Sequence, residues 1–482
     1  MVRSRYAPSP TGQMHIGNLR TALYEYLIAK HDGGTFILRI EDTDQNRYVE
    51  GATEVVINTM GIAGLNHDEG PGVGGDYGPY FQSERKDSYL PYAKELVEKG
   101  KAYYCFCSKD KPDQSEESEK EEGQKYDRHC LNMPKSEIEA KLAAGTPYVI
   151  RQFIPKGKTT FHDEVFGDIT IDHEEIEDQV LIKSDGMPTY NFANVIDDHL
   201  MDITHVVRGS EYLTSTPKYK LLYESLGWGV PIYVHLPLLL GDHGGKMSKR
   251  KGDPSFDDLL EQGYLPEAIV NYVAFLGWSS PDNREYFTLP ELVEVFDYKN
   301  ISKSPSSFDI KKLAWMNGEH IKRLPEDVFY QMVLPTLQST IKTPGIDLRE
   351  VARLVQSRVL LVKDSIELVD FIDHLPDYDI ELFTHKKMKT DPSVALTALK
   401  AIIPIYSAIS EDIWDNSTLY AAAVECGQAL GFKNSQILWP IRTALSGKPS
   451  SPCGASELCA LLGKEESLKR LKTGIEKLEV IS

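Results

Sequence analysis

Hydrophobic and polar positions at the start of the chain predict a strand, a helix and a second strand. An apolar run at 2–6 is followed by a turn rich in proline and glycine, and Leu19, Leu23 and Leu27 then recur at helical spacing up to a pair of glycines. The next apolar run, at 35–40, predicts the second strand. Such a βαβ unit has a right-handed connection, and its first turn lies at the carboxyl edge of a parallel sheet, where ligands bind.

Later apolar segments predict that the chain leaves this sheet and returns to it. Runs at 148–154 and 161–171 predict strands of an insertion. The apolar run at 179–183, directly before a Ser-Asp-Gly turn, predicts the strand that brings the chain back to the sheet. A helix at 216–226 and a buried parallel strand at 232–240 should follow.

From about residue 256 onward the apolar positions have helical spacing almost everywhere. Proline or glycine breaks separate the segments, and the regular short strands of a β-barrel are not predicted. The main predicted helices lie at 256–262, 265–276, 289–296, 350–362 and 393–407. The C-terminal half should therefore be helical.

These elements predict an α/β fold with a doubly wound, parallel, Rossmann-type sheet, an inserted α+β domain and a helical C-terminal half. A chain of 482 residues is too long for one core, so we expect three to five domains. The predicted domains are 1–84 with 186–245 for the sheet, 85–185 for the insertion, 246–323 for a loop and helices, and 324–482 for the helical region. The last region should contain two subdomains that meet near residue 385.

Composition limits the function classes and the compartment. The formal net charge of −19 argues against a generally basic, nonspecific nucleic-acid binder, although local basic strips could still bind a specific partner. The sequence contains no run of about twenty apolar residues, so no membrane span is predicted. Because the first strand starts at the N-terminus, there is no room for a targeting segment, and we expect a cytoplasmic protein. The Ser- and Glu-rich stretch 109–125 should form a loose loop.

Two segments carry candidate phosphate chemistry. Gly12 and Gly17 lack side chains, so phosphate oxygens could approach the backbone at the start of the first helix, where His15 adds a donor. Far along the chain, Lys246 and Lys249 flank a serine after a glycine-rich stretch, and positioned cations on a hinge stabilise phosphate charge. Taken singly, the first segment is a structural turn about as often as a phosphate site, and a lysine-rich stretch is usually a solvated loop or a nonspecific anion patch. Both segments follow strand ends, so they can face one crevice.

Together and in this order, the two segments resemble signatures of the class I aminoacyl-tRNA synthetases. His15-Ile16-Gly17-Asn18 is similar to the HIGH signature, with Asn18 where many relatives have histidine, and Lys246 to Arg250 is similar to the KMSKS signature. The surrounding blocks 7–12, 39–44, 188–198 and 205–209 resemble the glutamyl-tRNA synthetase family. The resemblance runs to about residue 325 and continues more loosely to the C-terminus. A helical second half is similar to the bacterial type, since the glutaminyl relatives have β-barrels there.

The resemblance implies a two-step reaction with ATP, L-glutamate and tRNA(Glu). The glutamate carboxylate attacks the α-phosphate to give glutamyl adenylate, and the 2′-hydroxyl of the terminal ribose of tRNA then takes the acyl group. Mg²⁺ would accompany ATP, bound mainly through the phosphates. The sheet domain would be catalytic, the insertion would bind the tRNA acceptor end, 246–323 would contact the tRNA stem, and the last region would bind the anticodon. A monomer is implied.

The resemblance also implies roles for individual residues. Arg5 and Arg208 would hold the γ-carboxylate of glutamate with help from Tyr190 and Asn194, because a guanidinium offers a planar fork to a carboxylate. Glu41 and Ser9 would take the α-ammonium. The implied catalytic residues are His15, Lys246 and Lys249; the implied glutamate site is Arg5, Ala7, Ser9, Glu41, Tyr190, Asn194 and Arg208; the implied ATP site is Gly12, His15, Gly17, Glu211, Lys246, Ser248 and Lys249.

Some of these residues have a structural alternative. Without the resemblance, Arg5 could equally form a salt bridge to Asp42 or Asp44, and Tyr190 could be a core aromatic residue. The adjacent carboxylates at 197 and 198 could simply fix a turn.

Cysteine spacing predicts a possible zinc site. Cys105 and Cys107 form a Cys-x-Cys pair, and Cys130 supplies a third thiolate of a tetrahedral centre. Some members of the resembled family complete Cys-x-Cys with Tyr-x-x-x-Cys, which selects Tyr126 as the fourth ligand. His129 is chemically more ordinary but stands where that spacing does not predict a ligand. Three reduced cysteines without a metal are the alternative.

Several functions remain compatible with the sequence. The enzyme could charge tRNA(Gln) as well as tRNA(Glu), or the chain could be a catalytically inactive tRNA-binding paralogue, although an inactive relative has no need of His15, Lys246 and Lys249. A nucleotidylyltransferase would share the histidine turn and the lysine loop but is usually shorter. A truncated paralogue that glutamylates a modified tRNA base would lack the helical second half.

Overall fold

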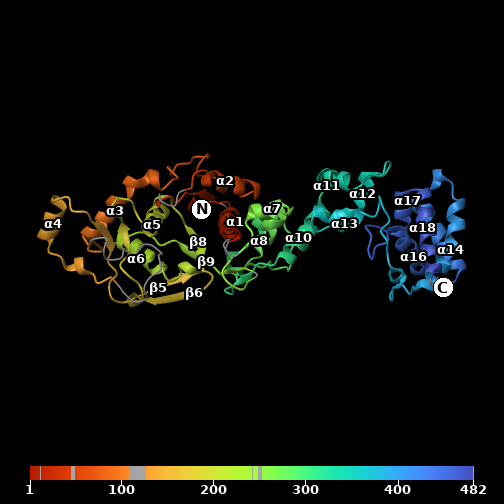
Figure 1. Cartoon of the computed structure of the whole chain (residues 1–482). Helices are drawn as coiled ribbons and strands as arrows, with labels where there is room; N and C mark the ends of the chain where they lie inside the picture. Colours follow the sequence, from red (N-terminus) through yellow and green to blue (C-terminus); the bar gives the residue numbers. More distant parts are fainter. Residues whose placement is uncertain are drawn as a thin grey trace. The chain divides into compact units, whose positions relative to one another are not determined.

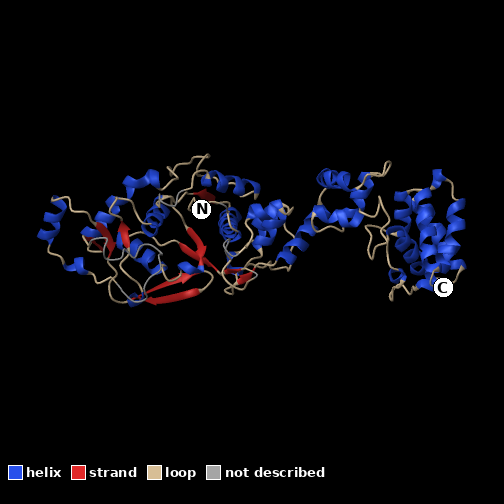
Figure 2. Ribbon diagram, viewed as in Figure 1, coloured by secondary structure: helices blue, strands red, loops and turns tan. Residues whose placement is uncertain are grey.

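A computed structural model describes residues 1–10, 12, 14–44, 49–107, 126–241, 243–247 and 252–480. The chain divides into two compact units, Met1–Leu313 and Ala314–Ser482. All described strands belong to the first unit, and the second unit is helical (Figures 1 and 2). The predicted fold class, an α/β part followed by a helical part, is confirmed.

A mainly parallel sheet forms the centre of the first unit. Its strand order is β2 (Thr35–Leu38), β1 (Arg3–Tyr6), β8 (His205–Gly209), β9 (Ile232–Leu236), β5 (Lys158–Asp163) and β6 (Gly167–Asp172). All pairs are parallel except the β5–β6 hairpin. Helix α1 (Ile16–His31) connects β1 to β2, as the leucine spacing predicts. At Gly34 a Cβ atom would lie 2.2 Å from the carbonyl oxygen of Val2, so only glycine lets the chain turn into β2.

The inserted segment contributes to two sheets. It forms a separate antiparallel sheet from β3 (Ala102–Cys105), β4 (Val149–Gln152) and β7 (Val180–Ile182), with α4 (Lys135–Ala143) between β3 and β4 in sequence. The prediction that 179–183 returns to the central sheet is wrong, because β7 pairs with β4. Instead, β5 joins the central sheet beside β9, and Phe161 of β5 packs in one core with Val206 and Tyr233.

Helices of the first unit pack against the insertion sheet. Phe192 of α5 (Tyr190–Leu200), Leu222 of α6 (Thr216–Leu226) and Tyr89 of α3 (Lys86–Glu98) share a buried core with Leu181 of β7. The apolar run at 232–240, predicted as one strand, is divided, since β10 (Leu239–Leu240) pairs with β11 (Ser306–Ser307) in a different sheet from β9. The remaining helices are α2 (Ala52–Ile62), α7 (Phe256–Glu261), α8 (Pro266–Ala274) and α9 (Leu289–Val295).

The second unit is built from helices, and α10 (Ile310–Arg323) leads into it. The others are α11 (Glu326–Thr340), α12 (Leu348–Gln356), α13 (Ser365–Val369), α14 (Pro392–Ala408), α15 (Asn416–Ala429), α16 (Asn434–Ser446), α17 (Ala455–Leu462) and α18 (Lys464–Glu479). Buried Arg470 of α18 donates to the carbonyl oxygens of Phe371, Ile372 and Leu445, which ties this helix to its neighbours. Among the described residues, no helix has both the length and the apolar character that crossing a membrane requires.

Candidate active site

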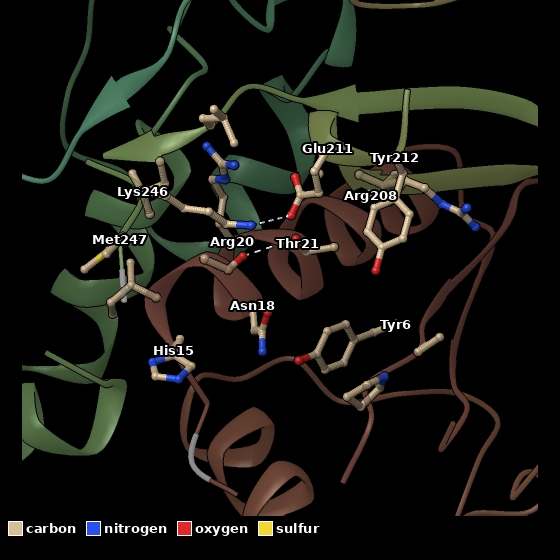
Figure 3. A pocket seen from close by; sticks show the side chains of 18 of the residues that line it. Tyr6, His15, Asn18, Arg20, Thr21, Arg208, Glu211, Tyr212, Lys246 and Met247 are labelled. Atoms are coloured by element: carbon tan, nitrogen blue, oxygen red, sulfur yellow. Dashed lines mark hydrogen bonds and ion pairs between the residues drawn. The ribbon is translucent and has the colours of Figure 1, made fainter. Parts of the chain in front are cut away.

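A cavity of about 510 Å³ lies at the carboxyl ends of β1, β8 and β9 and at the start of α1 (Figure 3). The predicted site residues that line it are Arg5, Ala7, Ser9, His15, Gly17, Tyr190, Arg208, Glu211 and Lys246. Gly12, Glu41 and Asn194 are described but are not among its lining residues. Ser248 and Lys249, like the loop predicted at 109–125, lie outside the described residues. Most of the predicted residues therefore face one cavity.

The N-terminal turn and the lysine segment meet at this cavity. Lys246 forms an antiparallel bridge with Leu240, so its segment folds back on β10 as a hairpin. Further along, Ser255 forms an antiparallel bridge with His15, and the N–H of Phe256 donates to the carbonyl oxygen of Met14 at 3.3 Å. One flank of the lysine segment is thus fixed to β10 and the other beside the start of α1.

An exposed ion pair crosses one side of the cavity. Nζ of Lys246 donates to Oε1 of Glu211 at 2.9 Å, and the two side chains are 63% and 43% exposed (Figure 3). Burial alone would raise the pKa of Glu211, but hydrogen bonds from its own backbone and from Lys246 lower the net pKa below its ordinary value. A Cβ at Gly209 would lie 2.1 Å from Oε2 of Glu211, so glycine lets the carboxylate fold back over the turn after β8.

The opposite side of the cavity is a buried network of charges. Arg5 donates from Nε and Nη2 to Asp198 at 2.8 and 3.2 Å, and from Nη1 to Glu25 at 3.0 Å. A guanidinium has five N–H groups, so Nη1 and Nη2 of Arg5 each keep one for another acceptor. The partner expected on structural grounds, Asp42 or Asp44, is replaced by two carboxylates from α5 and α1.

Arg39 extends this network toward Glu41. Its guanidinium pairs with Asp198 at 2.8 Å and with Glu41 at 2.9 Å. Burial would raise the pKa of Asp198, but Arg5 and Arg39 outweigh burial and lower the net pKa. Burial raises the pKa of Glu25 to about 8, although Arg5 acts in the opposite direction. Two guanidinium groups and three carboxyl groups therefore lie close together and are almost completely buried.

Two buried charged residues near the cavity have side-chain atoms without a partner among the described residues. Nε and Nη1 of Arg208 and Oε2 of Glu41 have no hydrogen-bond partner among the described residues, and the two residues are only 6% and 3% exposed. The guanidinium of Arg208 lies over the rings of Tyr212 and Tyr219 at 5.3 and 4.8 Å. Burial and nearby Glu41 raise the pKa of Tyr190, which keeps its hydroxyl neutral in the cavity wall. Free donor atoms on a buried cation and a free acceptor atom on a buried carboxylate suit a zwitterionic ligand.

Asn194 supports the wall without lining it. Its Nδ2 donates to the backbone oxygen of Tyr190 at 2.9 Å, and the side chain is almost completely buried. The neighbouring carboxylate Asp197 accepts from Gln82, Arg85 and Tyr89 at 2.7 to 2.9 Å. The contacts of Asp197 are therefore with the packing around α5.

A second cluster contains the predicted metal ligands. The Sγ atoms of Cys105, Cys107 and Cys130 lie within 4.8 Å of one another. The hydroxyl of Tyr126 lies 3.0 Å from Sγ of Cys105 and 3.8 Å from Sγ of Cys107. Exposed His129 does not belong to the cluster formed by the described Cys, His, Asp and Glu residues. Three thiols and a phenol oxygen around one point are a donor set that suits zinc.

Sequence reasoning missed the charged residues behind the cavity wall, namely Arg20, Glu25 and Arg39. Arg20 and Glu25 lie within the apolar pattern of α1 and are buried with it. A charged residue among buried leucines was the available signal, since such residues are rarely buried unless they are paired.

The comparisons with known proteins cover nearly the whole chain. The family model described as "tRNA synthetases class I (E and Q), catalytic domain" matches residues 1–315, and the one described as "Anticodon binding domain" matches 328–475. Glutamate–tRNA ligases of Clostridium botulinum (strain Eklund 17B / Type B) and Clostridium kluyveri are 56% and 54% identical over 99% and 100% of this chain and 99% of their own length. The crystal structure of a glutamate tRNA ligase from Elizabethkingia meningosepticum in complex with its amino acid has a TM-score of 0.82 at 34% identity and covers 99% of both chains.

Proposed function

The chain belongs to the glutamate–tRNA ligases of the class I tRNA synthetases, and we propose that its cavity activates L-glutamate with ATP and delivers the glutamyl group to the 3′-terminal ribose of tRNA(Glu). The observation that carries the proposal is a set of buried atoms of opposite charge without a partner among the described residues: Nε and Nη1 of Arg208, and Oε2 of Glu41, whose other oxygen binds Arg39. A free amino acid offers a carboxylate to the first and an ammonium to the second.

The glutamate end uses residues of β1, β8 and α5. The γ-carboxylate binds the free N–H groups of Arg208 and the two N–H groups that Arg5 keeps, with the hydroxyl of Tyr190 beside it. Asn194 holds the backbone of Tyr190 in place. Glu41 takes the α-ammonium, and Ser9 and Ala7 form the wall next to it. Glutamine is rejected, because its neutral amide leaves a buried guanidinium without a counter-charge.

The ATP end uses the start of α1 and the lysine hairpin. Gly12 and Gly17 give the phosphates access to the backbone N–H groups of the helix start, and His15 donates to them. Lys246 and Lys249 balance the charge of the leaving pyrophosphate, with Ser248 between them, while Glu211 accepts from the ribose hydroxyls of ATP. Mg²⁺ enters with ATP and is held mainly by the phosphates.

The first step needs position and charge more than acid–base chemistry. An oxygen of the α-carboxylate attacks the α-phosphorus, the bond from that phosphorus to the bridging oxygen breaks, and pyrophosphate leaves. Since a carboxylate is already a nucleophile, the rate comes from alignment and from cations around the transferring group. In the second step a ribose hydroxyl of tRNA attacks the carbonyl carbon, AMP leaves, and the hydroxyl proton passes to solvent.

ATP–pyrophosphate exchange tests the proposal. We expect exchange with L-glutamate in the presence of tRNA(Glu), and at least about 100-fold less with L-glutamine or without tRNA. Exchange that depends on a different small acid and ignores tRNA would instead support a nucleotidylyltransferase. No exchange at all, with tRNA binding intact, would support an inactive tRNA-binding paralogue.

The second unit and the insertion supply the tRNA contacts in this proposal. The anticodon-binding match at 328–475 supports anticodon contact by the helical region, in line with the predicted domain 324–482. The segments 85–185 and 246–323 are assigned to the acceptor end and the stem. Charging of purified tRNA(Glu) and tRNA(Gln) side by side measures whether the enzyme distinguishes the two.

The cysteine cluster is assigned to zinc. Cys105, Cys107 and Cys130 would hold the ion with Tyr126 as the fourth ligand, and the metal would fix the end of β3 to the segment that follows. Atomic absorption on protein purified without chelators should give about one zinc per chain. Cys130→Ser should lose the metal, whereas Cys426→Ser, a buried cysteine outside the cluster, should keep it. Zinc near zero in the unaltered protein would remove the site.

We also propose that the protein works as a monomer in the cytoplasm. Light scattering on the purified protein should give the mass of one chain, and fractionation of cells that produce it should place it with the other soluble components of translation.

A further inference from the structure

Arg20 is a buried cation in the wall of the cavity to which the proposed reaction gives no role. It lies on α1, is 4% exposed and stands beside the Lys246–Glu211 ion pair (Figure 3). Its Nη1 donates to the carbonyl oxygen of Leu276 at 3.0 Å and its Nη2 to that of Pro237 at 2.6 Å. Its Nε is buried and has no partner within the described part of the chain. Both known partners of Arg20 are neutral.

The charge of Arg20 is therefore poorly compensated. In the part of the chain that the structure describes, no carboxylate forms an ion pair with it. Glu211 acts on Arg20 through space, but its carboxylate already binds Lys246 at 2.9 Å, so two cations share one anion. Burial lowers the pKa of Arg20 below its ordinary value, against the effect of Tyr24 and Glu211. An anion in the cavity would offset the cost of this buried charge.

The two hydrogen bonds of Arg20 fix the base of the lysine hairpin. Pro237 lies between β9 and β10, and β10 carries the hairpin through the Leu240–Lys246 bridge and the hydrogen bond from the N–H of Met247 to the oxygen of Leu239. The second acceptor of Arg20 belongs to the turn after α8. One guanidinium thus joins the start of α1, the base of the hairpin and the end of α8.

We propose that Arg20 is a positioning residue for the nucleotide: it fixes the base of the Lys246 hairpin against α1, and its charge attracts the phosphates of ATP to the same wall. This inference rests on the proposed function, since it takes ATP as the occupant of the cavity. The two contributions are separable. The charge acts on ATP affinity, whereas the carbonyl contacts set the place of the Lys246 ammonium and so act on turnover.

Two substitutions separate these contributions in ATP–pyrophosphate exchange with saturating glutamate and tRNA(Glu). Arg20→Gln removes the charge and should raise the KM for ATP roughly 10- to 100-fold and lower kcat, with the KM for glutamate within about twofold of the unaltered enzyme. Arg20→Lys keeps the charge but loses the planar fork, so it should restore the KM for ATP to within about threefold while kcat stays about tenfold low. Added KCl should raise the KM for ATP more steeply in the unaltered enzyme than in Arg20→Gln.

A matched control is Arg470→Gln, because Arg470 also donates to carbonyl oxygens but belongs to the second unit and is not among the residues that line the cavity. It should lower the melting temperature without changing the KM for ATP. The inference on Arg20 is overturned if the glutamine and lysine variants have equal KM values for ATP, or if both keep the kcat of the unaltered enzyme. If the unaltered enzyme itself shows no glutamate-dependent exchange, the proposed function fails instead. If Arg20→Gln does not fold, the KM and kcat of Arg20→Lys decide alone.

Discussion

The proposed glutamate end and the proposed ATP end of the cavity are built in opposite ways. At the glutamate end Arg5, Asp198 and Glu25 are buried, and each is held by partners within 3.2 Å. At the ATP end Lys246 and Glu211 are 63% and 43% exposed and have each other as ion-pair partners. The glutamate end is preorganised, whereas the ATP end contains a pair that a ligand can open.

This difference has an energetic basis. Buried ion pairs are costly to break, because the remaining charge has neither water nor a partner, while an exposed pair is worth less than about 1 kcal/mol. A small zwitterion is selected well by groups that are fixed before it arrives. The charge on a triphosphate changes during the reaction, and cations that can move stabilise it better than fixed ones.

The largest effect is expected at Arg208, whose Nε and Nη1 have no partner among the described residues and would bind the substrate carboxylate in the proposed site. Arg208→Gln should raise the KM for glutamate by at least about 100-fold, since the substrate carboxylate loses its charged partner, and should change the KM for ATP less than about threefold. Steady-state exchange kinetics measure both values. Arg208→Lys keeps the charge without the planar fork of the guanidinium, so its KM for glutamate should lie between those of the unaltered enzyme and Arg208→Gln. If both KM values rose together, the separation of the two ends would be wrong.

The next effect is on stability, at the carboxylate that binds two arginines. Asp198→Asn leaves Arg5 and Arg39 with less counter-charge in a buried network and should lower the free energy of unfolding by about 3 kcal/mol in urea titrations. As a control, Asp168→Asn, at a carboxylate whose side chain is 76% exposed, should change it by less than about 1 kcal/mol. If both substitutions lowered the free energy of unfolding equally, the buried network would not be more costly to break than an exposed ion pair.

A smaller effect concerns pH. Burial raises the pKa of Glu25 in the folded protein to about 8, above its ordinary value of 4.5. The folded state therefore binds a proton more tightly than the unfolded state, and stability from this group is present at low pH and is lost as pH rises through about 8. Between pH 6 and 8 the unaltered protein should lose up to about 1.4 kcal/mol per pH unit relative to Glu25→Gln. Identical pH profiles of the two proteins would contradict this.

The smallest effect is expected at the exposed pair. Glu211→Gln should change the free energy of unfolding by less than about 1 kcal/mol, because water already screens both side chains. Thermal melts in low and high salt should differ little between this variant and the unaltered protein. A loss as large as that of Asp198→Asn would mean that the ATP end is as rigid as the glutamate end.

The sequence predicted local elements better than their partners. The helices at 216–226 and 393–407 have the predicted positions within one residue, because periodic apolar spacing is a local property. Strand β7 was assigned to the wrong sheet, and nothing in 161–171 indicated that β5 joins the central sheet, since a short strand does not specify which strand lies alongside it. For the same reason the run at 232–240 gave no sign that it is shared between two sheets.

The candidate site has the same limit. His15, Arg208 and Lys246 could be brought to one cavity from sequence, because each stands near a strand end and the resemblance names their roles. The buried charges Glu25 and Arg39 could not, because Glu25 binds Arg5 on a different element and Arg39 binds Asp198 more than 150 residues away, and no local pattern encodes such contacts.

The β5–β6 hairpin makes the insertion part of the sheet it interrupts. It covers the side of β9 that would otherwise end the sheet, and Asp163 of β5 binds His235 of β9 at 2.7 Å with both side chains fully buried. Excising 158–172 to obtain a smaller enzyme would leave β9 without its neighbouring strand at Tyr233 and would expose the backbone oxygen of that residue. An exposed edge strand can pair with strands of other chains. The shortened protein should therefore aggregate instead of yielding a minimal ligase.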